Sequence, residues 1–192
     1  MKYSELPLVF KKIDRADFIL PEYKNEAYED YPLPIGYGGT ISQPSTVAFM
    51  LDILEPRVGQ KILDIGSGSG WTTALLAYIA GKKGHIYGVE IVPELVSFGR
   101  MNLQKYDLPQ AEILQSRSER ALGLPERAPF DRILVSASAN KLPQELINQL
   151  SPKGIMVVPI KNSIWKIKKK KDETIEKKEY PGFIFVQLQT LK

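Results

Sequence analysis

Apolar positions follow two different spacings along the chain, and the change of spacing separates predicted helices from predicted strands. Residues 43–54 place apolar side chains three or four positions apart, which predicts an amphipathic helix beginning near Pro44. The segment 61–65 is instead a short apolar run that ends at glycines, as buried strands do. Residues 1–40 show no sustained period and are rich in Pro, Tyr and Glu, so we expect an arm with short turns.

The middle of the chain repeats the order strand, then helix. Besides 61–65, strands are predicted at 85–90, 111–115, 132–138 and 155–160, helices at 71–80, 93–106 and 143–150, and turns at 81–84 and 151–154. Apolar strands alternating with helices imply a parallel sheet that is covered on both faces, with right-handed crossovers. We therefore predict an α/β fold with a Rossmann-like, doubly wound and mostly parallel sheet.

The C-terminal segment has a different pattern. SIWKIKKKK and GFIFVQLQ flank the polar stretch DETIEKKEYP, which suggests an antiparallel hairpin added to the sheet edge. Residues 161–192 hold nine lysines and four acidic residues, a net charge of +5 within a chain of net charge +4. We interpret the lysines as a solvated edge that discourages strand-to-strand aggregation, with weak attraction to an acidic partner or RNA as the alternative.

Composition narrows the classes of protein and of site. The 192 residues are 43% hydrophobic and 25% charged, which excludes a disordered or fibrous chain. No uncharged apolar run is long enough to span a membrane and no signal peptide is visible, so a cytoplasmic location is expected. The chain has no cysteine and one histidine, His85, which excludes thiolate or multi-histidine metal sites, and no metal is predicted.

The strongest local motif is Leu63-Asp64-Ile65-Gly66-Ser67-Gly68-Ser69-Gly70, between a predicted strand and a predicted helix. Glycines there allow a sharp turn and let a ligand lie against the backbone. Open α/β sheets bind ligands beyond the carboxyl ends of their strands, where this loop falls. The sequence matches neither the P-loop nor the G-x-G-x-x-G spacing.

Two carboxylates accompany the loop. Glu90 ends the next strand, 20 residues after Gly70, where it could accept hydrogen bonds from both hydroxyls of a ribose. Asp64 directly precedes the glycines, where it could meet the ammonium group of S-adenosylmethionine, and no phosphate-binding pattern favours NAD. The structural alternatives are a turn-capping role for Asp64 and a helix-start charge for Glu90.

Together these residues resemble the protein-L-isoaspartate O-methyltransferase family over roughly residues 10–190. The blocks that carry the resemblance are AYEDYPLPIGYGGTISQP (27–44), ILDIGSGSGWTTALLA (62–77), GVEIVPEL (88–95), GLPERAPFDRILVSASANKLPQELINQL (123–150), GIMVVPI (154–160) and FIFVQL (183–188). The first block is specific to this family, whereas the second and third are shared by most enzymes that use S-adenosylmethionine.

The resemblance implies an enzyme that transfers a methyl group from S-adenosylmethionine to the α-carboxylate of L-isoaspartyl residues in damaged proteins or peptides. Because the sequence shows no internal repeat and no linker, we predict one domain over 1–192: an arm and helix (1–54), a cofactor-binding core (55–160) and a hairpin (161–192). Nucleic acid and membrane are not expected as partners, since an RNA enzyme would spread basic residues and stacking aromatics around its cleft. The oligomeric state is left open.

The resemblance also assigns residues. Thr40, Ile41 and Ser42 would line the substrate site, and the Ser42 hydroxyl would hydrogen-bond and aim the reacting carboxylate. From local sequence alone Ser42 could equally be the N-cap of the following helix. The residues expected to hold the cofactor are Asp64, Gly66, Ser67, Gly68, Gly70, Glu90 and Glu119, the last beside the adenine.

The chain departs from the family pattern at several points. Gly39 stands where the family has Gln, which removes donors and acceptors from the substrate face. The stretch 118–120 reads Ser-Glu-Arg in place of Gly-Asp-Gly, and Gln187 replaces a proline. Two alternatives therefore stand beside the repair enzyme: a methyltransferase of the same fold acting on another peptide or on RNA, and a non-catalytic cofactor-binding module.

Overall fold

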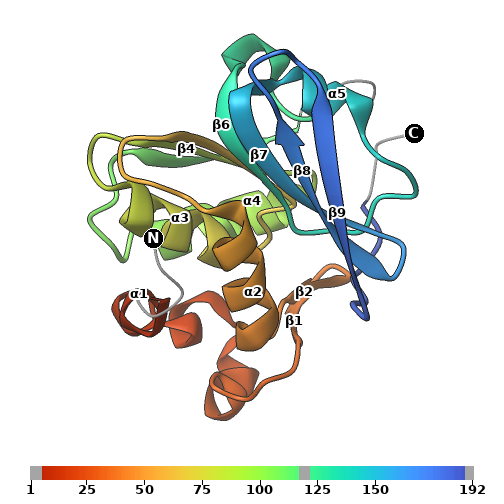
Figure 1. Cartoon of the computed structure of the whole chain (residues 1–192). Helices are drawn as coiled ribbons and strands as arrows, with labels where there is room; N and C mark the ends of the chain where they lie inside the picture. Colours follow the sequence, from red (N-terminus) through yellow and green to blue (C-terminus); the bar gives the residue numbers. More distant parts are fainter. Residues whose placement is uncertain (1–5, 117–121, 189–192) are drawn as a thin grey trace.

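The structure is a computed structural model that describes residues 6–116 and 122–188. A seven-stranded sheet forms its centre (Figure 1). Its strands are β3 (Lys61–Ile65), β4 (His85–Glu90), β5 (Ala111–Gln115), β6 (Phe130–Val135), β7 (Leu150–Ile160), β8 (Ser163–Lys169) and β9 (Ile175–Pro181). They lie in the order β5-β4-β3-β6-β7-β8-β9, with β3 to β7 parallel and the last two antiparallel. The predicted mostly parallel α/β sheet is confirmed.

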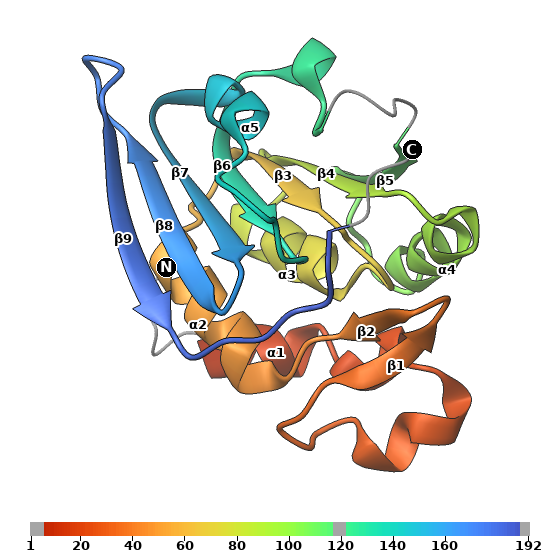
Figure 2. The same cartoon turned by 90° about the vertical axis from the view of Figure 1, so that its right-hand side faces the viewer.

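Helices cover the two faces of this sheet unequally (Figure 2). They are α1 (Leu6–Lys12), α2 (Pro44–Leu54), α3 (Trp71–Ala80), α4 (Pro93–Leu103) and α5 (Gln144–Asn148), with the 3-10 helices η2 (Arg15–Phe18), η3 (Pro21–Glu26) and η4 (Pro125–Arg127). Residues of α1 to α4 join one hydrophobic core with Ile62 and Ile86, whereas α5 packs on the opposite face with Leu63 and Val135. Successive strand residues alternate between the two cores because a strand turns its side chains to opposite faces.

The N-terminal arm is more regular than its sequence predicts. It carries α1, η2 and η3, followed by a small antiparallel ladder of β1 (Leu33–Gly36) and β2 (Gly39–Ile41). Val9, Ile13 and Phe18 are buried in the same core as α3, so the arm is part of the main hydrophobic interior. The sequence did not predict these helices because each is only one or two turns long and packs against residues that are distant in sequence.

Helix α2 confirms the prediction for 43–54, with one correction at its start. Gln43, not Ser42, is the N-cap residue, and its side chain makes no capping bond. Pro44 takes the first helical position, where its missing N–H costs nothing. Ser42 therefore lies outside the helix, which leaves its side chain without the capping role.

Four predicted elements need correction. The strand predicted at 132–138 is β6, which begins earlier and ends at Val135, and the helix predicted at 93–106 ends at Leu103. The helix predicted at 143–150 is only the five-residue α5. The segment 151–154 is not a turn between elements, because it lies inside β7, where the register with β6 shifts and Lys153 adopts a positive φ. A bulge absorbs those residues within the strand.

The C-terminal hairpin exists, but the prediction of its second strand was wrong. Strand β8 pairs with β9, which is formed from the polar stretch and not from GFIFVQLQ. Charged side chains suit an edge strand because they discourage its open backbone edge from pairing with another chain. Residues 183–188 instead return to the main body, where Ser138 N donates to Val186 O and Leu188 N donates to Ser138 O.

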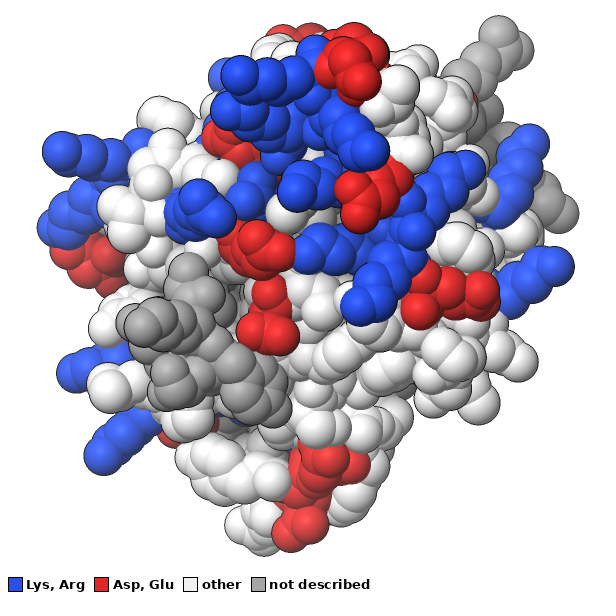
Figure 3. All heavy atoms as spheres, in the orientation of Figure 1, with Lys and Arg blue, Asp and Glu red and all other residues white. Residues whose placement is uncertain are grey.

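Lysine and arginine side chains gather over the β7–β9 part of the face in Figure 3, with acidic side chains among them. Lys169 pairs with Glu173 at 2.9 Å, and Lys170 pairs with Glu176 at 4.0 Å. The lysine-rich segment is thus partly neutralised by its own hairpin. Across residues 6–116 and 122–188, no helix combines the length and apolarity needed to cross a membrane.

Candidate functional site

A cavity of about 780 Å³ opens at the carboxyl ends of β3, β4 and β6. From β3 the chain adds β4 and β5 on one side and then returns to add β6 and β7 on the other. The cavity therefore lies at the topological switch point, where open α/β sheets bind their ligands. Its walls come from the glycine loop (residues 66–70), the end of β4, the segment 136–145, Val186 to Leu188 and the segment 27–42. We call residues 27–42 the substrate arm, after the role expected for Thr40 to Ser42.

Left-handed backbone shapes the glycine loop. Gly66, Gly68 and Gly70 have φ angles of 71°, 52° and 91°, which L side chains rarely adopt. The amides of Gly66 and Ser67 both donate to the carbonyl oxygen of Val89, at 2.9 and 3.1 Å. The loop is thus fixed to the adjacent strand β4 by its own backbone.

Two glycines of this loop also allow close approach by other elements. A Cβ at Gly70 would lie 3.2 Å from the carbonyl oxygen of Gly99 in α4, so the start of α3 packs tightly there. A Cβ at Gly68 would lie 2.9 Å from Ile35 Cδ1, so the loop meets the substrate arm directly. Glycine is therefore favoured at position 70 by the close packing against α4 and at position 68 by the close contact with the substrate arm.

Glu90 ends β4 and lines the cavity while being only 6% exposed. Its Oε2 accepts a hydrogen bond from Gly68 N at 2.9 Å, and its Oε1 accepts from Ile91 N and Val92 N at 2.7 and 3.0 Å. Three backbone amides therefore fix the carboxylate between the glycine loop and the approach to α4. This place at the cavity wall suits a ribose, although that role stays a prediction.

Asp64 lies beneath the loop and away from the cavity. It is fully buried, and its Oδ2 accepts from Thr72 Oγ1 and Thr73 Oγ1 at 2.7 and 2.6 Å. Ser136 Oγ lies 3.4 Å from its Oδ1. Burial raises the pKa of Asp64 from 3.8 to about 6, against the effect of these hydroxyl donors. Asp64 lines neither the cavity nor the smaller recess described below, and it meets them through the hydroxyls of Thr72 and Ser136, so its expected contact with an ammonium group stays a prediction.

A smaller recess of about 30 Å³ joins the glycine loop to the substrate arm. Thr40, Ile41 and Ser42 line it, and so do Gly66, Ser67 and Gly68. The structure thus brings the three residues expected at the substrate site against residues expected at the cofactor. Thr72 and Ser136, which hold Asp64, line the same recess.

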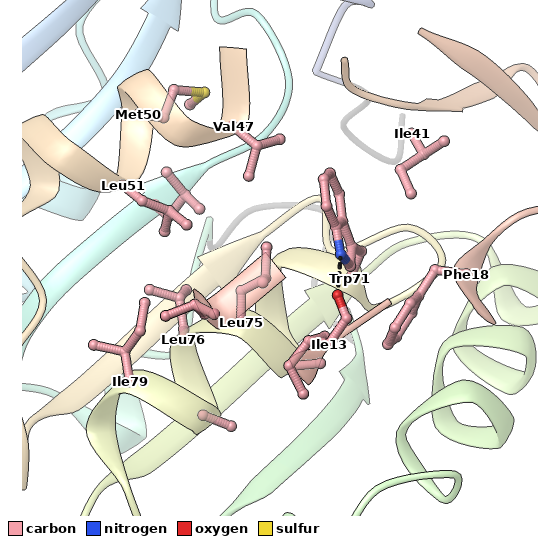
Figure 4. Close-up of a cluster of buried hydrophobic side chains, with 14 of the residues drawn as sticks. Ile13, Phe18, Ile41, Val47, Met50, Leu51, Trp71, Leu75, Leu76 and Ile79 are labelled. Carbon is pink, nitrogen blue, oxygen red and sulfur yellow. Dashed lines mark hydrogen bonds between the residues drawn. The ribbon is translucent and has the colours of Figure 1, made fainter. Parts of the chain in front are cut away.

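The three arm residues differ in exposure. Thr40 is exposed and lines the large cavity as well as the recess. Ile41 is 5% exposed and belongs to the hydrophobic core near Trp71 and Val47, as Figure 4 shows. Ser42 is half-buried, and its hydroxyl makes no hydrogen bond with any residue that the structure describes.

The recess also contains an unsatisfied polar group of the kind that a ligand can satisfy. The Ser67 hydroxyl oxygen is buried and has no hydrogen-bond partner among the described residues. Such groups are uncommon because an unpaired buried hydroxyl costs free energy. A polar ligand lying along the glycine loop would supply the missing partner, which fits the amino-acid part of S-adenosylmethionine.

Glu119, which was expected beside the adenine, lies outside the described residues. Three further residues near the site or in the sequence motifs are placed as follows. Trp71 is 2% exposed, and its Nε1 donates to Ile13 O at 3.2 Å, so it packs the arm while also lining the recess. Tyr37 lines the cavity mouth and is 62% exposed. His85 is exposed at the first residue of β4, away from the cavity.

Sequence reasoning missed several parts of the site. Val186 to Leu188 line the cavity although they were assigned to an edge hairpin, and Ile35 and Leu95 add apolar wall. Thr72 and Thr73 lie in the first turn of α3, just after the glycine loop that begins at the end of β3, so a contact with Asp64 near the end of β3 could have been inferred from that arrangement. The C-terminal contribution had only the FIFVQL block as a signal, because nothing local indicates where an extended segment returns.

Comparison with known proteins agrees with this geometry. The family model for protein-L-isoaspartate(D-aspartate) O-methyltransferase matches residues 2–192. A protein-L-isoaspartate O-methyltransferase 2 from Archaeoglobus fulgidus is 41% identical over 182 residues, covering 93% of this chain and 82% of the relative. A protein-L-isoaspartate O-methyltransferase from Pyrobaculum islandicum is 39% identical over 181 residues, covering 92% and 86%.

A solved structure supports the same assignment and the cofactor class. It is a Plasmodium falciparum protein described as a protein-L-isoaspartate O-methyltransferase, in complex with S-adenosyl-L-homocysteine. It matches with a TM-score of 0.82 at 28% identity, covering 94% of this chain and 88% of that one. The predicted fold class, methyltransferase class and S-adenosylmethionine cofactor are thereby confirmed at the level of the family. The chain belongs to the protein-L-isoaspartate(D-aspartate) O-methyltransferase family.

Proposed function

We propose that this chain transfers a methyl group from S-adenosylmethionine to the α-carboxylate of L-isoaspartyl residues in damaged proteins or peptides. The observation that carries the proposal is the shared recess, where Thr40 and Ser42 of the substrate arm meet Gly66 to Gly68 of the glycine loop. A transferase needs its donor and acceptor sites to adjoin in this way. Family membership supplies the substrate class.

In this proposal the cofactor lies along the glycine loop. The backbone of the loop supports its amino-acid part at Gly66, Ser67, Gly68 and Gly70. The Glu90 carboxylate accepts hydrogen bonds from the ribose hydroxyls. When bound, the cofactor supplies an electrophilic methyl group on a positively charged sulfur. The apolar side chains of Ile35 and Leu95 then help exclude water from that part of the cavity.

The acceptor carboxylate needs no base from this chain. A carboxyl group with a pKa of about 4 is already ionised at neutral pH, so no proton has to be removed before attack. What the protein must provide is alignment, and alignment of reacting groups can be worth about 7–11 kcal/mol. The residue set fits this demand, because hydroxyl groups and backbone rather than a triad surround the recess.

Ser42 would provide much of the alignment. Its hydroxyl has no partner within the described residues and is not used as an N-cap, so it is available to donate to one carboxylate oxygen. Such a bond leaves the other oxygen of the acceptor directed at the methyl group. Thr40, which lines both the large cavity and the small recess, would contact the substrate beside Ser42.

Gly39 modifies the substrate face in this chain. A Cβ at this position would lie 3.3 Å from both Ile35 Cγ1 and Leu95 Cδ1. Those apolar side chains occupy the neighbourhood where a glutamine side chain of the family would begin. We infer a less polar substrate face than the family pattern implies, which makes the substrate the first property to test.

The test is methyl transfer from labelled S-adenosylmethionine to two peptides that differ only in one isoaspartyl or aspartyl linkage. Base-labile label is expected on the isoaspartyl peptide alone. The Ser42→Ala variant should reduce kcat about 10- to 100-fold, as loss of a hydrogen bond to a charged group does. Ser45→Ala is the matched control, because Ser45 is exposed on the first turn of α2 and lines neither hollow.

Equal labelling of both peptides, or none on either despite cofactor binding in a calorimeter, would contradict the proposed substrate. Label on an RNA or on an unrelated peptide carboxylate would identify the alternative methyltransferase instead. The proposal also includes a cytoplasmic location and a single domain, and fractionation of source cells with immunodetection of this chain would test the location.

A further inference from the structure

Arg15 is a buried charge whose hydrogen-bond partners among the described residues are all backbone carbonyls. It begins η2 and is 3% exposed. Among the described residues its guanidinium forms no ion pair with a carboxylate. Its two terminal nitrogens donate to Ala27 O (2.8 Å), Glu29 O (3.2 Å), Tyr31 O (3.0 Å), Ile41 O (3.5 Å) and Ser42 O (3.2 Å).

These carbonyls belong to two stretches of the substrate arm. Ala27, Glu29 and Tyr31 precede the β1–β2 ladder, whereas Ile41 is its last residue and Ser42 follows it. The guanidinium therefore ties the beginning of the arm to its end, and the end carries the substrate residues. Burial lowers the pKa of Arg15 to about 10, so the side chain keeps its charge at neutral pH.

Arg15 also contacts the element that follows the glycine loop. Its guanidinium carbon lies 5.7 Å from the centroid of the Trp71 ring, within cation–π distance. Trp71 is the first residue of α3, directly after Gly70, and its indole nitrogen bonds the carbonyl of Ile13. Figure 4 shows this indole between the arm residue Ile41 and the N-terminal residues Ile13 and Phe18.

We propose that Arg15 is a positioning residue for methyl transfer, which fixes the Thr40–Ser42 backbone relative to the glycine loop. The inference rests on the proposed function, since it assumes that Ser42 aims the acceptor. Arg15 touches neither hollow and acts through the carbonyls of Ile41 and Ser42. Its loss displaces the acceptor side, while the cofactor side keeps its own backbone anchors to β4.

The Arg15→Lys variant separates charge from geometry. An ammonium keeps the positive charge but lacks the planar fork that reaches several carbonyls at once. We expect kcat to fall about 10- to 100-fold, as misplacement of reacting groups by about 1 Å can cause. The Kd for S-adenosylhomocysteine should stay within about twofold, because Glu90 and the glycine loop do not bond to Arg15.

Arg132→Lys is the matched control for loss of a buried guanidinium. Arg132 is 5% exposed in β6 and also donates to carbonyls, those of Glu55 and Asp131, but it lines neither hollow. Both variants should lose stability, so kcat is measured well below the unfolding midpoint of each. Only Arg15→Lys should lower kcat.

Hydrogen exchange provides a readout that needs no substrate. Amides of residues 27–43 should exchange faster in Arg15→Lys than in Arg132→Lys, whereas those of 61–70 should be equal in both. The inference is overturned when exchange of 27–43 is the same in the two variants, or when active Arg15→Lys keeps a kcat within about twofold of the control. A wild-type chain that methylates no isoaspartyl peptide would contradict the proposed function alone, and the exchange comparison would still decide the role of Arg15.

Discussion

The glycine loop and the substrate arm line one cavity, yet they are held in place by different means. The loop is anchored by backbone bonds to the neighbouring strand, from Gly66 N and Ser67 N to Val89 O. The arm is held by a two-stranded ladder and by the side chain of Arg15, which lies 12 to 27 residues away from its carbonyl partners. The glycine loop is thus held by backbone bonds to an adjacent strand of the sheet, whereas the substrate arm depends on one buried side chain from outside it.

This difference separates two properties of the enzyme. Changes in the loop should alter cofactor affinity and stability, and changes in the arm should alter turnover. Gly68 is where the two regions touch, through Ile35. Perturbing each region in turn shows how independent they are.

The largest effect is expected beneath the loop, at Asp64. Burial raises the pKa of this carboxyl from 3.8 to about 6 in the folded protein. Above pH 6 the carboxyl must be ionised while buried, which destabilises the folded state. Stability from Asp64 is fully present below about pH 4 and is lost as the pH rises through 6. The shift corresponds to about 3 kcal/mol. Urea unfolding of wild type and Asp64→Asn between pH 4 and pH 8 measures it.

The free energy of unfolding of the wild type, relative to Asp64→Asn, should therefore rise as the pH falls from 7 to 4. A difference that stays constant over this interval would show that the carboxyl titrates normally. A difference that falls toward pH 4 would mean that the hydroxyls of Thr72 and Thr73 stabilise the ionised form more than burial destabilises it.

A slightly smaller effect is expected at Glu90, where a substitution should weaken the affinity for the cofactor. Glu90→Gln replaces a carboxylate that accepts from three amides and, in our account, from the ribose. Loss of hydrogen bonds to a charged group should weaken cofactor binding about 10- to 100-fold. Calorimetry with S-adenosylhomocysteine measures the Kd, with exposed Glu94→Gln as the control. Equal affinities of the two variants would remove Glu90 from the cofactor site.

The smallest effect is expected where the regions touch. Gly68→Ala and Gly59→Ala both place a side chain on left-handed backbone, at a cost of about 1–2 kcal/mol. Only the alanine at 68 would also meet a neighbour, Ile35 Cδ1 at 2.9 Å, whereas nothing lies within 4 Å at 59. Thermal unfolding should show a greater loss for Gly68→Ala, and kcat should fall only in that variant. Identical behaviour would mean that the arm moves freely past the loop.

The same contrast explains what the sequence could predict. The β3 strand, the glycine loop and Glu90 are consecutive features with local causes, so their places followed from the pattern of apolar residues and glycines. Ser42 was placed at the substrate site by family resemblance, and its alternative role as N-cap is taken by Gln43. The roles of Arg15 and Trp71 in the arm depend on contacts between distant residues, which periodicity does not record.

The C-terminal segment illustrates a second limit. The apolar run at 183–188 looks like a strand, and its hairpin partner was assigned by hydrophobicity. The polar stretch became β9 instead, because an edge strand needs no apolar face, and the apolar run returned to cover the cavity. Which of two segments pairs at an edge is decided by the rest of the fold.

The central claim is that the recess brings the acceptor carboxylate at Ser42 to the cofactor at the glycine loop. A crystal structure with S-adenosylhomocysteine and an isoaspartyl peptide tests it most directly. Our account predicts the ribose hydroxyls within hydrogen-bond distance of Glu90 and the isoaspartyl α-carboxylate within hydrogen-bond distance of Ser42 Oγ. A carboxylate bound elsewhere, with Ser42 facing only water or protein, would contradict the account.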